Sequence, residues 1–410
     1  MKNKKLLNPE GFRDFLPDAF REKRRICDGI MSTFESFGYD PVQSPMLEYV
    51  EVYGGKAERE TYRFINRDGD ILALRPDMTP AVARIAATHF TAADYPLRIC
   101  YKENVFRFNE SHKGKTGEFT EAGVELIGAR SAEADAEIVA LAVESLLSAS
   151  LTDFRVDVGH VGFLSGLLEE TGLCPEECEK IMECLINRDY VMLERSLANN
   201  EVSGNAYGLF TNLLSLTGGP EIIDEVYEKT GSERARSALC DLRKIYESVG
   251  GYGRGLCGYI RFDLGIIGHL DYYTGMLIRG YGGFSGFSIL DGGRYDNLAA
   301  NFGAEAASVG FAVKIDNLPI DNSDSGGRIF VGYAKDSRDT AVKAGHALRR
   351  KGDVVENALA AASYDECVGY AEKKNASRLL YFDGDTVKSL DMKSGDIVES
   401  AAEEADRRQA

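Results

Sequence analysis

The most informative segment of the sequence is EFTEAGVELI, residues 118–127. Successive side chains of a β-strand point to opposite faces of its sheet, and this segment alternates accordingly. One predicted face is mostly apolar: Thr120, Ala122, Val124 and Leu126. The other face carries two carboxylates: Phe119, Glu121, Gly123, Glu125 and Ile127. Glu121 and Glu125 are therefore expected to point the same way, roughly 13 Å apart along the strand.

Two interpretations of this acidic face remain open from the strand alone. A strand at the edge of a sheet would simply expose Glu121 and Glu125 to solvent. Alternatively, the face is the floor of a pocket that receives a cationic or hydrogen-bond-donating group, such as an amine or an imidazole, because buried carboxylates require such partners.

The segments before this strand predict a mixture of helices and strands. A helix is expected over 19–37 after Asp18 as N-cap, and a strand over 70–74. Thr79 and Pro80 predict the N-cap and first residue of a helix that ends near His89. A strand over 97–108 and a polar loop over 109–117 lead into the acidic strand, and a helix over 131–150 follows it.

The segments after residue 160 predict a helical insertion and then further strands. Residues 160–250 are mostly helical in pattern, with breaks at glycines. Strands are expected at 261–264, 271–281, 287–290 and 308–314, and a tight turn into a helix at 291–296. Tyr272 and Tyr273 would lie on opposite faces of their strand, so that one packs and the other lines a cavity. Clustered strands favour an α+β fold, an antiparallel sheet with helices on one face.

The C-terminal part of the chain has a different pattern. Residues 319–327 form a polar linker, PIDNSDSGG. Beyond it, strands and helices alternate: β 328–334, α 337–350, β 353–359, α 363–375 and β 377–382. Such alternation favours a small domain with a largely parallel sheet.

The composition excludes several classes of protein. The chain has 410 residues, of which 44% are hydrophobic. Its net charge of −17 argues against non-specific binding to nucleic acid. No run of about 18 apolar residues predicts a membrane span, and no apolar core of a signal peptide follows the basic N-terminus. Eight scattered cysteines indicate a reducing cytoplasm rather than a disulfide framework.

No motif predicts a cofactor or a metal. Cys174, Cys178 and Cys184 lack a CxxC spacing and a nearby histidine, so we expect no metal site there. The five histidines form no spaced pair, and no phosphate-binding fingerprint, nucleophile elbow or HExxH motif is present.

Five motifs in order resemble those of histidyl-tRNA synthetases and their paralogues. They are GFRDFLP (11–17), LRPDMT (74–79), EFTEAGVE (118–125), LDYYTG (270–275) and GGRYD (292–296). The resemblance implies a class II synthetase-like domain over 1–318, with a helical insertion at about 160–255. It also implies an anticodon-binding-like α/β domain over 328–410 after the linker 319–327, and a homodimer formed through a region that includes Pro45.

The departures from the synthetase pattern concern the arginines that hold ATP. Arg107 matches the first arginine of the second class motif, whereas Glu110, Gly117, Gly268 and Asn317 stand where the synthetases have arginines. Replacing a phosphate-clamping arginine by glutamate reverses the sign of the local interaction. Loss of several charge-assisted hydrogen bonds, at about 1.5–3 kcal/mol each, is expected to abolish adenylation.

The residues that hold histidine in the synthetases are retained in kind. Those positions are Asp77, Thr79, Glu121, Glu125, Tyr272 and Tyr273, and Arg107 is assigned to the same site. Asp77 is one methylene shorter than the usual glutamate, and Glu121 stands where glutamine is common. A pocket of this kind resembles that of the regulatory subunit of ATP phosphoribosyltransferase, a non-catalytic synthetase paralogue.

That resemblance implies partners and a role. The chain is expected to join the short-form catalytic subunit of the transferase in a cytoplasmic hetero-oligomer, without a cofactor, in the first step of histidine biosynthesis, with histidine as feedback effector. Residues 328–410 carry 14 basic and 15 acidic side chains, which makes tRNA binding unexpected. A divergent histidyl-tRNA synthetase and a paralogue serving another partner are the alternatives.

Overall fold

The chain forms two compact units, residues 1–320 and 321–410. The computed structural model describes residues 4–54, 58, 60–108, 116–253, 255–268, 272–282, 286–319 and 327–401. Each unit is described by itself below. None of the described helices combines the length and the apolar character that a membrane crossing requires.

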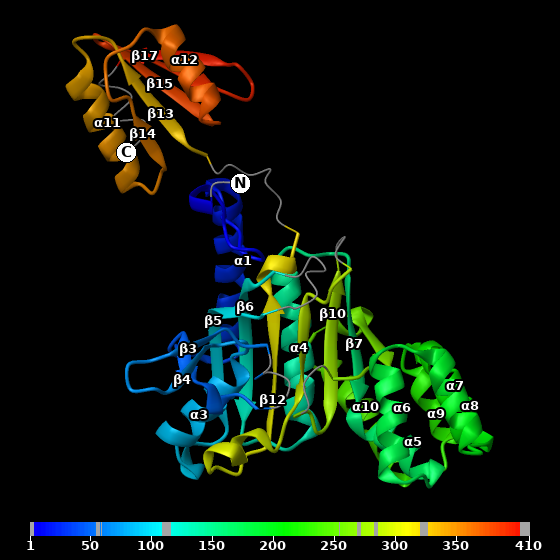
Figure 1. Ribbon diagram of the computed structural model, residues 1–410. Coiled ribbons are helices and arrows are strands. Elements are labelled where there is room, and N and C mark those ends of the chain that lie inside the picture. Colours follow the sequence, from blue (N-terminus) through cyan, green and yellow to red (C-terminus); the bar gives the residue numbers. More distant parts are fainter. Residues whose placement is uncertain are drawn as a thin grey trace. The chain divides into compact units, whose positions relative to one another are not determined.

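A nine-stranded sheet forms the frame of the first unit (Figure 1). Its strand order is β1-β5-β6-β12-β11-β10-β7-β9-β8. The strands are β1 (Asp40–Pro41), β5 (Leu97–Phe106), β6 (Glu118–Ile127), β7 (Phe154–His160), β8 (Thr217–Gly218), β9 (Ile260–Asp263), β10 (Met276–Gly282), β11 (Leu290–Arg294) and β12 (Ser308–Lys314). Neighbours are antiparallel except for β1 with β5 and β7 with β9. A small sheet, β2-β4-β3, consists of β2 (Leu47–Tyr49), β3 (Arg63–Ile65) and β4 (Ile71–Leu74).

Helices cover both faces of the large sheet. The helices of this unit are α1 (Pro17–Ser36), α3 (Thr79–His89), α4 (Ala132–Ser148), α5 (Val161–Thr171), α6 (Pro175–Ile186), α7 (Tyr190–Asn199), α8 (Gly204–Thr211), α9 (Glu221–Lys229) and α10 (Glu233–Val249). Ala122, Val124 and Leu126 of β6 are buried in one core with side chains of α1, α4 and α10. On the opposite face, Met78 and Val82 pack α3 against β5 and β6. The expectation of helices on one face only was therefore incomplete.

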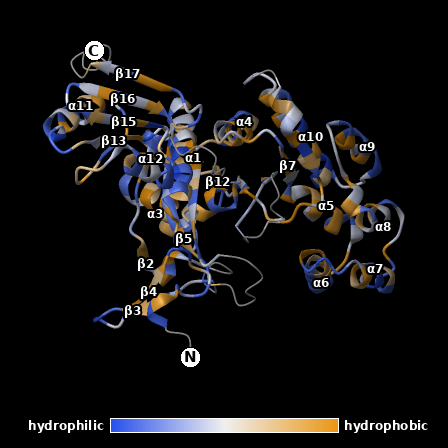
Figure 2. Ribbon diagram, turned by 90° about the horizontal axis from the view of Figure 1, so that it is seen from above, coloured by the Kyte–Doolittle hydropathy of each residue, from blue (hydrophilic) through white to orange (hydrophobic). Residues whose placement is uncertain are grey.

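The insertion consists of the helices α5 to α10. Buried residues such as Leu167, Leu193 and Leu239 join its helices to the main core. Figure 2 shows that α6 to α9 carry both hydrophobic and hydrophilic residues, as helices with one buried face do. The insertion thus extends the core at the β7 side of the sheet.

Two predicted helix starts were wrong in detail. Helix α1 begins at Pro17 after Leu16, and Asp18 lies in its first turn rather than at the N-cap. Helix α3 begins at Thr79 itself, after Met78, with Pro80 as its second residue. The hydroxyl of Thr79 is bonded to Glu125 instead of capping the helix, because a buried carboxylate competes for it.

The predicted turn over 291–296 and strand over 287–290 were also wrong, because β11 spans Leu290–Arg294. Gly292 and Gly293 are not turn residues: they leave room for residues of other segments, which a Cβ at either position would overlap. A Cβ at Gly292 would lie 2.5 Å from the Cβ of Phe311 on β12. Local sequence alone cannot reveal this close approach between strands.

The second unit contains a five-stranded sheet of order β14-β13-β15-β16-β17. Its elements are β13 (Ile329–Tyr333), α11 (Arg338–Arg350), β14 (Val355–Asn357), α12 (Tyr364–Lys373), β15 (Arg378–Asp383), β16 (Thr386–Asp391) and β17 (Ile397–Ala401). β13, β14 and β15 are parallel. The antiparallel strands β16 and β17 were not predicted.

Candidate functional site

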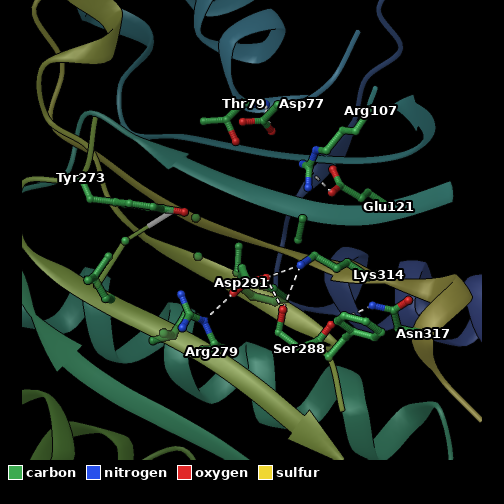
Figure 3. A pocket seen from close by; sticks show the side chains of 18 of the residues that line it. Asp77, Thr79, Arg107, Glu121, Tyr273, Arg279, Ser288, Asp291, Lys314 and Asn317 are labelled. Atoms are coloured by element: carbon green, nitrogen blue, oxygen red, sulfur yellow. Dashed lines mark hydrogen bonds and ion pairs between the residues drawn. The ribbon is translucent and has the colours of Figure 1, made fainter. Parts of the chain in front are cut away.

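A cavity of about 400 Å³ lies on the face of the large sheet opposite α4 (Figure 3). Six of the seven predicted site residues line it: Asp77, Thr79, Arg107, Glu121, Tyr272 and Tyr273. The seventh, Glu125, lies directly behind the lining and accepts a hydrogen bond from Thr79. The structure therefore brings the whole predicted set together, from α3, β5–β6 and the segment before β10.

Glu121 is a buried acidic side chain on the floor of the cavity. Its side chain is only 3% exposed. Arg107 Nη2 donates to Glu121 Oε1 at 3.2 Å, while Oε2 is buried without a hydrogen-bond partner among the described residues. Burial raises the pKa of Glu121 to about 7, against the nearby Arg107 guanidinium, which lowers it. This face of β6 is thus a pocket floor rather than a solvated edge.

Glu125 is held by two hydroxyl groups. Thr79 Oγ1 donates to Oε1 at 2.8 Å, and Tyr295 Oη donates to Oε2. Gly310 on β12 makes room for this carboxylate, because a Cβ there would overlap its Oε2. Burial raises the pKa of Glu125 to about 8, although both hydroxyl groups favour the ionised form. Burial therefore raises the pKa of both glutamates on this face of β6.

Asp77 joins the acidic cluster from the loop before α3. One carboxylate oxygen accepts from Tyr272 Oη at 3.0 Å and the other from the backbone N–H of Thr79 at 3.2 Å. The rings of Tyr272 and Tyr273 lie 4.9 Å apart, and both line the cavity. The prediction that they occupy opposite faces of a strand was wrong, because β10 begins only at Met276.

Among the described residues, three positions at which the resemblance implies arginines hold Gly117, Gly268 and Asn317. Asn317 donates its amide to the carbonyl of Ser288 at 2.9 Å. Gly268 lines the cavity without a side chain. Glu110 lies outside the described residues, as do most of the predicted loop 109–117 and residues 269–271. Arg107 is bound to the carbonyl of Pro76 at 2.7 Å and stacks 5.0 Å from the ring of Phe119.

A second group of charged side chains lines the cavity and was not predicted. Arg279 Nε donates to Asp291 Oδ1 at 2.9 Å, and Lys314 Nζ donates to Asp291 Oδ2 and, at 2.9 Å, to Ser288 Oγ. Figure 3 shows this cluster on the same floor as Glu121. Tyr295 was also missed as a site residue. Recognising 290–294 as a strand would have placed Asp291 on the cavity face by alternation.

The charges of the cavity lining are balanced. The acidic residues are Glu60, Asp77, Glu121 and Asp291, and the basic residues are Arg107, Arg188, Arg279 and Lys314. A triphosphate site normally presents an excess of cations or backbone N–H groups. Among the described residues, no three His, Cys, Asp or Glu side chains are placed to hold a metal ion. The arrangement best fits a small ligand that carries both charges.

The comparisons with known proteins identify a family for this chain. The family model of histidyl-tRNA synthetase matches residues 11–318. The chain is 34% identical to an ATP phosphoribosyltransferase regulatory subunit from Acetivibrio thermocellus, over 96% of both chains. It is 37% identical to the protein of the same name from Clostridium kluyveri, over 87% of this chain and 94% of that one.

Two solved structures share the fold. A protein from Bacillus halodurans, described as an ATP phosphoribosyltransferase regulatory subunit/histidyl-tRNA synthetase, has a TM-score of 0.82 and 32% identity, covering 93% of this chain and 99% of its own. A histidyl-tRNA synthetase from Nostoc also reaches 0.82, covering 98% and 99%, but at 21% identity it shows the fold alone. The chain therefore belongs to the family of ATP phosphoribosyltransferase regulatory subunits, which has the histidyl-tRNA synthetase-like class II fold.

Proposed function

We propose that the chain is a non-catalytic subunit that assembles with a short-form ATP phosphoribosyltransferase catalytic subunit and makes it sensitive to free histidine. Histidine would bind in the cavity, and its binding would favour one state of the assembly over the other, since an effector regulates only through such a difference. The names of the relatives support the partner, and a cavity lined by both carboxylates and cations supports a zwitterionic effector.

The observation that carries the proposal is that one buried oxygen of Glu121 has no hydrogen-bond partner in the described part of the chain. A buried carboxylate oxygen without a donor is costly, so it favours a ligand that supplies an N–H group. Glu125 and Asp77 add two further carboxyl groups within the same cluster. A cationic amine and an imidazole together match this set, with Tyr272 and Tyr273 as aromatic walls.

The balanced lining and the substituted arginines support a role without adenylation. Asn317 and Gly268 supply no cation, and Arg107 already faces Glu121. We therefore assign no catalytic residue and no cofactor to this chain, and we assign the chemical step to the partner. The near-neutral net charge of residues 328–410 supports a C-terminal unit that does not bind tRNA.

A homodimer within the hetero-oligomer belongs to the same proposal. Next to Pro45, the apolar side chains of Met46, Leu47 and Tyr49 are 48%, 43% and 56% exposed. Contiguous exposed apolar residues favour an interface between subunits. We place the contact between two copies at this segment, in a cytoplasmic complex.

The test combines the chain with a short catalytic subunit and measures phosphoribosyl transfer to ATP, with and without histidine. We expect the chain to be required for full activity and histidine to inhibit. Glu121→Ala should preserve assembly and activation while weakening inhibition, whereas Glu179→Ala, at an exposed position of α6, should behave as wild type. Histidine-dependent exchange between pyrophosphate and ATP by the chain alone would instead favour a divergent synthetase. Failure to assemble would favour a different partner.

A further inference from the structure

Lys314 stands directly beside Glu121 on the cavity floor. The two residues are paired in register between β12 and β6, and both line the cavity. Directly paired residues of antiparallel strands have Cβ atoms about 4.5–5.5 Å apart on the same face. A cation and an anion therefore lie next to each other at the bottom of the cavity (Figure 3).

Lys314 belongs to a cluster with Arg279 and Asp291, in which two cations share one anion. Lys314 and Arg279 both contact the single carboxylate of Asp291. Burial alone would raise the pKa of Asp291, but the two cations hold it well below its usual range. Asp291 is thus an anion, and the cluster of Arg279, Asp291 and Lys314 is positive by one charge.

Both members of the pair keep unused bonding capacity. An ammonium group has three N–H donors. Among the described residues, Lys314 uses two of them, in hydrogen bonds to Ser288 and Asp291. Glu121 Oε1 accepts a hydrogen bond from Arg107, while Oε2 accepts none from the described part of the chain. The cavity floor therefore offers one N–H donor and one carboxylate oxygen side by side.

We propose that Glu121 and Lys314 form a subsite for the two charged groups of a free α-amino acid. Glu121 accepts from the α-ammonium group, and Lys314 donates to the α-carboxylate. In an amino acid both groups are bonded to the same carbon atom, which places the nitrogen and a carboxylate oxygen roughly 3 Å apart and suits neighbouring positions on adjacent strands. The proposal deepens the proposed function, on which it rests, by assigning the carboxylate contact that determines the ligand class.

The same geometry discriminates against other ligands. An amine without a carboxylate leaves Lys314 without its additional acceptor. A polyphosphate chain that reached Lys314 would meet the carboxylates of Glu121 and Asp291 on either side. The subsite therefore selects free amino acids over both decarboxylated amines and nucleotides.

The test compares L-histidine with histamine, which lacks the carboxylate, by titration calorimetry on the full chain. Wild type should bind histidine roughly ten- to a hundredfold more tightly than histamine, as expected for one charge-assisted hydrogen bond. Lys314→Met should lower the affinity for histidine by that factor and leave the affinity for histamine within about threefold. Lys180→Met, an exposed residue of α6, is the matched control and should retain the preference.

Two further variants guard against misfolding and misassignment. Lys314→Arg keeps the charge and should restore most of the preference for histidine. Asp291→Asn removes the competing anion and should tighten histidine binding more than histamine binding. If wild type binds histidine but Lys314→Met keeps the full preference, the subsite assignment is overturned while the proposed function stands. If wild type binds neither compound, histidine sensing in this cavity is itself wrong.

Discussion

Replacing Glu125 by glutamine should change the stability of the protein in a way that reverses with pH. Burial raises the pKa of Glu125 from 4.5 to about 8. The folded chain therefore holds a proton between these pH values that the unfolded chain has released, so the free energy of unfolding falls as pH rises through this window. For Glu125 alone the loss is about 3 kcal/mol between pH 5 and pH 7.

The glutamine variant has no such titration, but it loses one acceptor. Thr79 and Tyr295 each donate to a separate oxygen of Glu125, and an amide offers only one oxygen. This loss costs about 1–3 kcal/mol at every pH. Glu125→Gln should therefore be less stable than wild type at pH 5, and as stable or more stable at pH 8.

The assay is denaturant unfolding followed by circular dichroism at pH 5, 6, 7 and 8. The difference between variant and wild type isolates Glu125 from the rest of the chain. Glu118→Gln, at the partly exposed start of the same strand, is the control and should keep the wild-type dependence on pH. A constant difference between Glu125→Gln and wild type across this range would show that Glu125 does not titrate in this window.

Three other predictions concern the site and its support. Gly310→Ala should destabilise the first unit by about 1–3 kcal/mol in thermal melts, because its Cβ would overlap Glu125 Oε2 and the Val124 carbonyl. Gly286→Ala, which meets nothing within 4 Å, should be neutral. Arg294→Met should cost about 3–5 kcal/mol, since buried Asp135 loses both of its guanidinium contacts, and urea midpoints would reveal it. Glu121, with its pKa of about 7, ionises between pH 6 and pH 8. The affinity of wild type for histidine, divided by that of Glu121→Gln, should therefore rise about tenfold over this range. Calorimetric titrations measure this ratio, and a ratio that does not change with pH would contradict the prediction.

The sequence predicts those parts of the molecule that local periodicity encodes. The alternation along residues 118–127 places Glu121 and Glu125 on one face, and β6 has this arrangement. Helix α3 ends at His89 as expected. Such features depend on neighbours within a few residues, so the pattern contains them.

The missed features depend on contacts between distant segments. The glycines of β11 indicate a turn locally, yet they serve the close approach of Phe311 on β12. Lys314 and Asp291 become a pair only when β11 and β12 are aligned. Thr79 resembles an N-cap in isolation, but the buried Glu125 takes its hydroxyl. These contacts depend on strand register and burial, which are set by several segments together and cannot be read from one segment alone.

The most direct test of the account is to titrate the full chain with L-histidine and, separately, with ATP and magnesium, in the same calorimeter and buffer. We expect saturable binding of histidine that Glu121→Ala weakens, and no saturable binding of the nucleotide. Tight binding of ATP, with histidine binding only when the nucleotide is present, would contradict it.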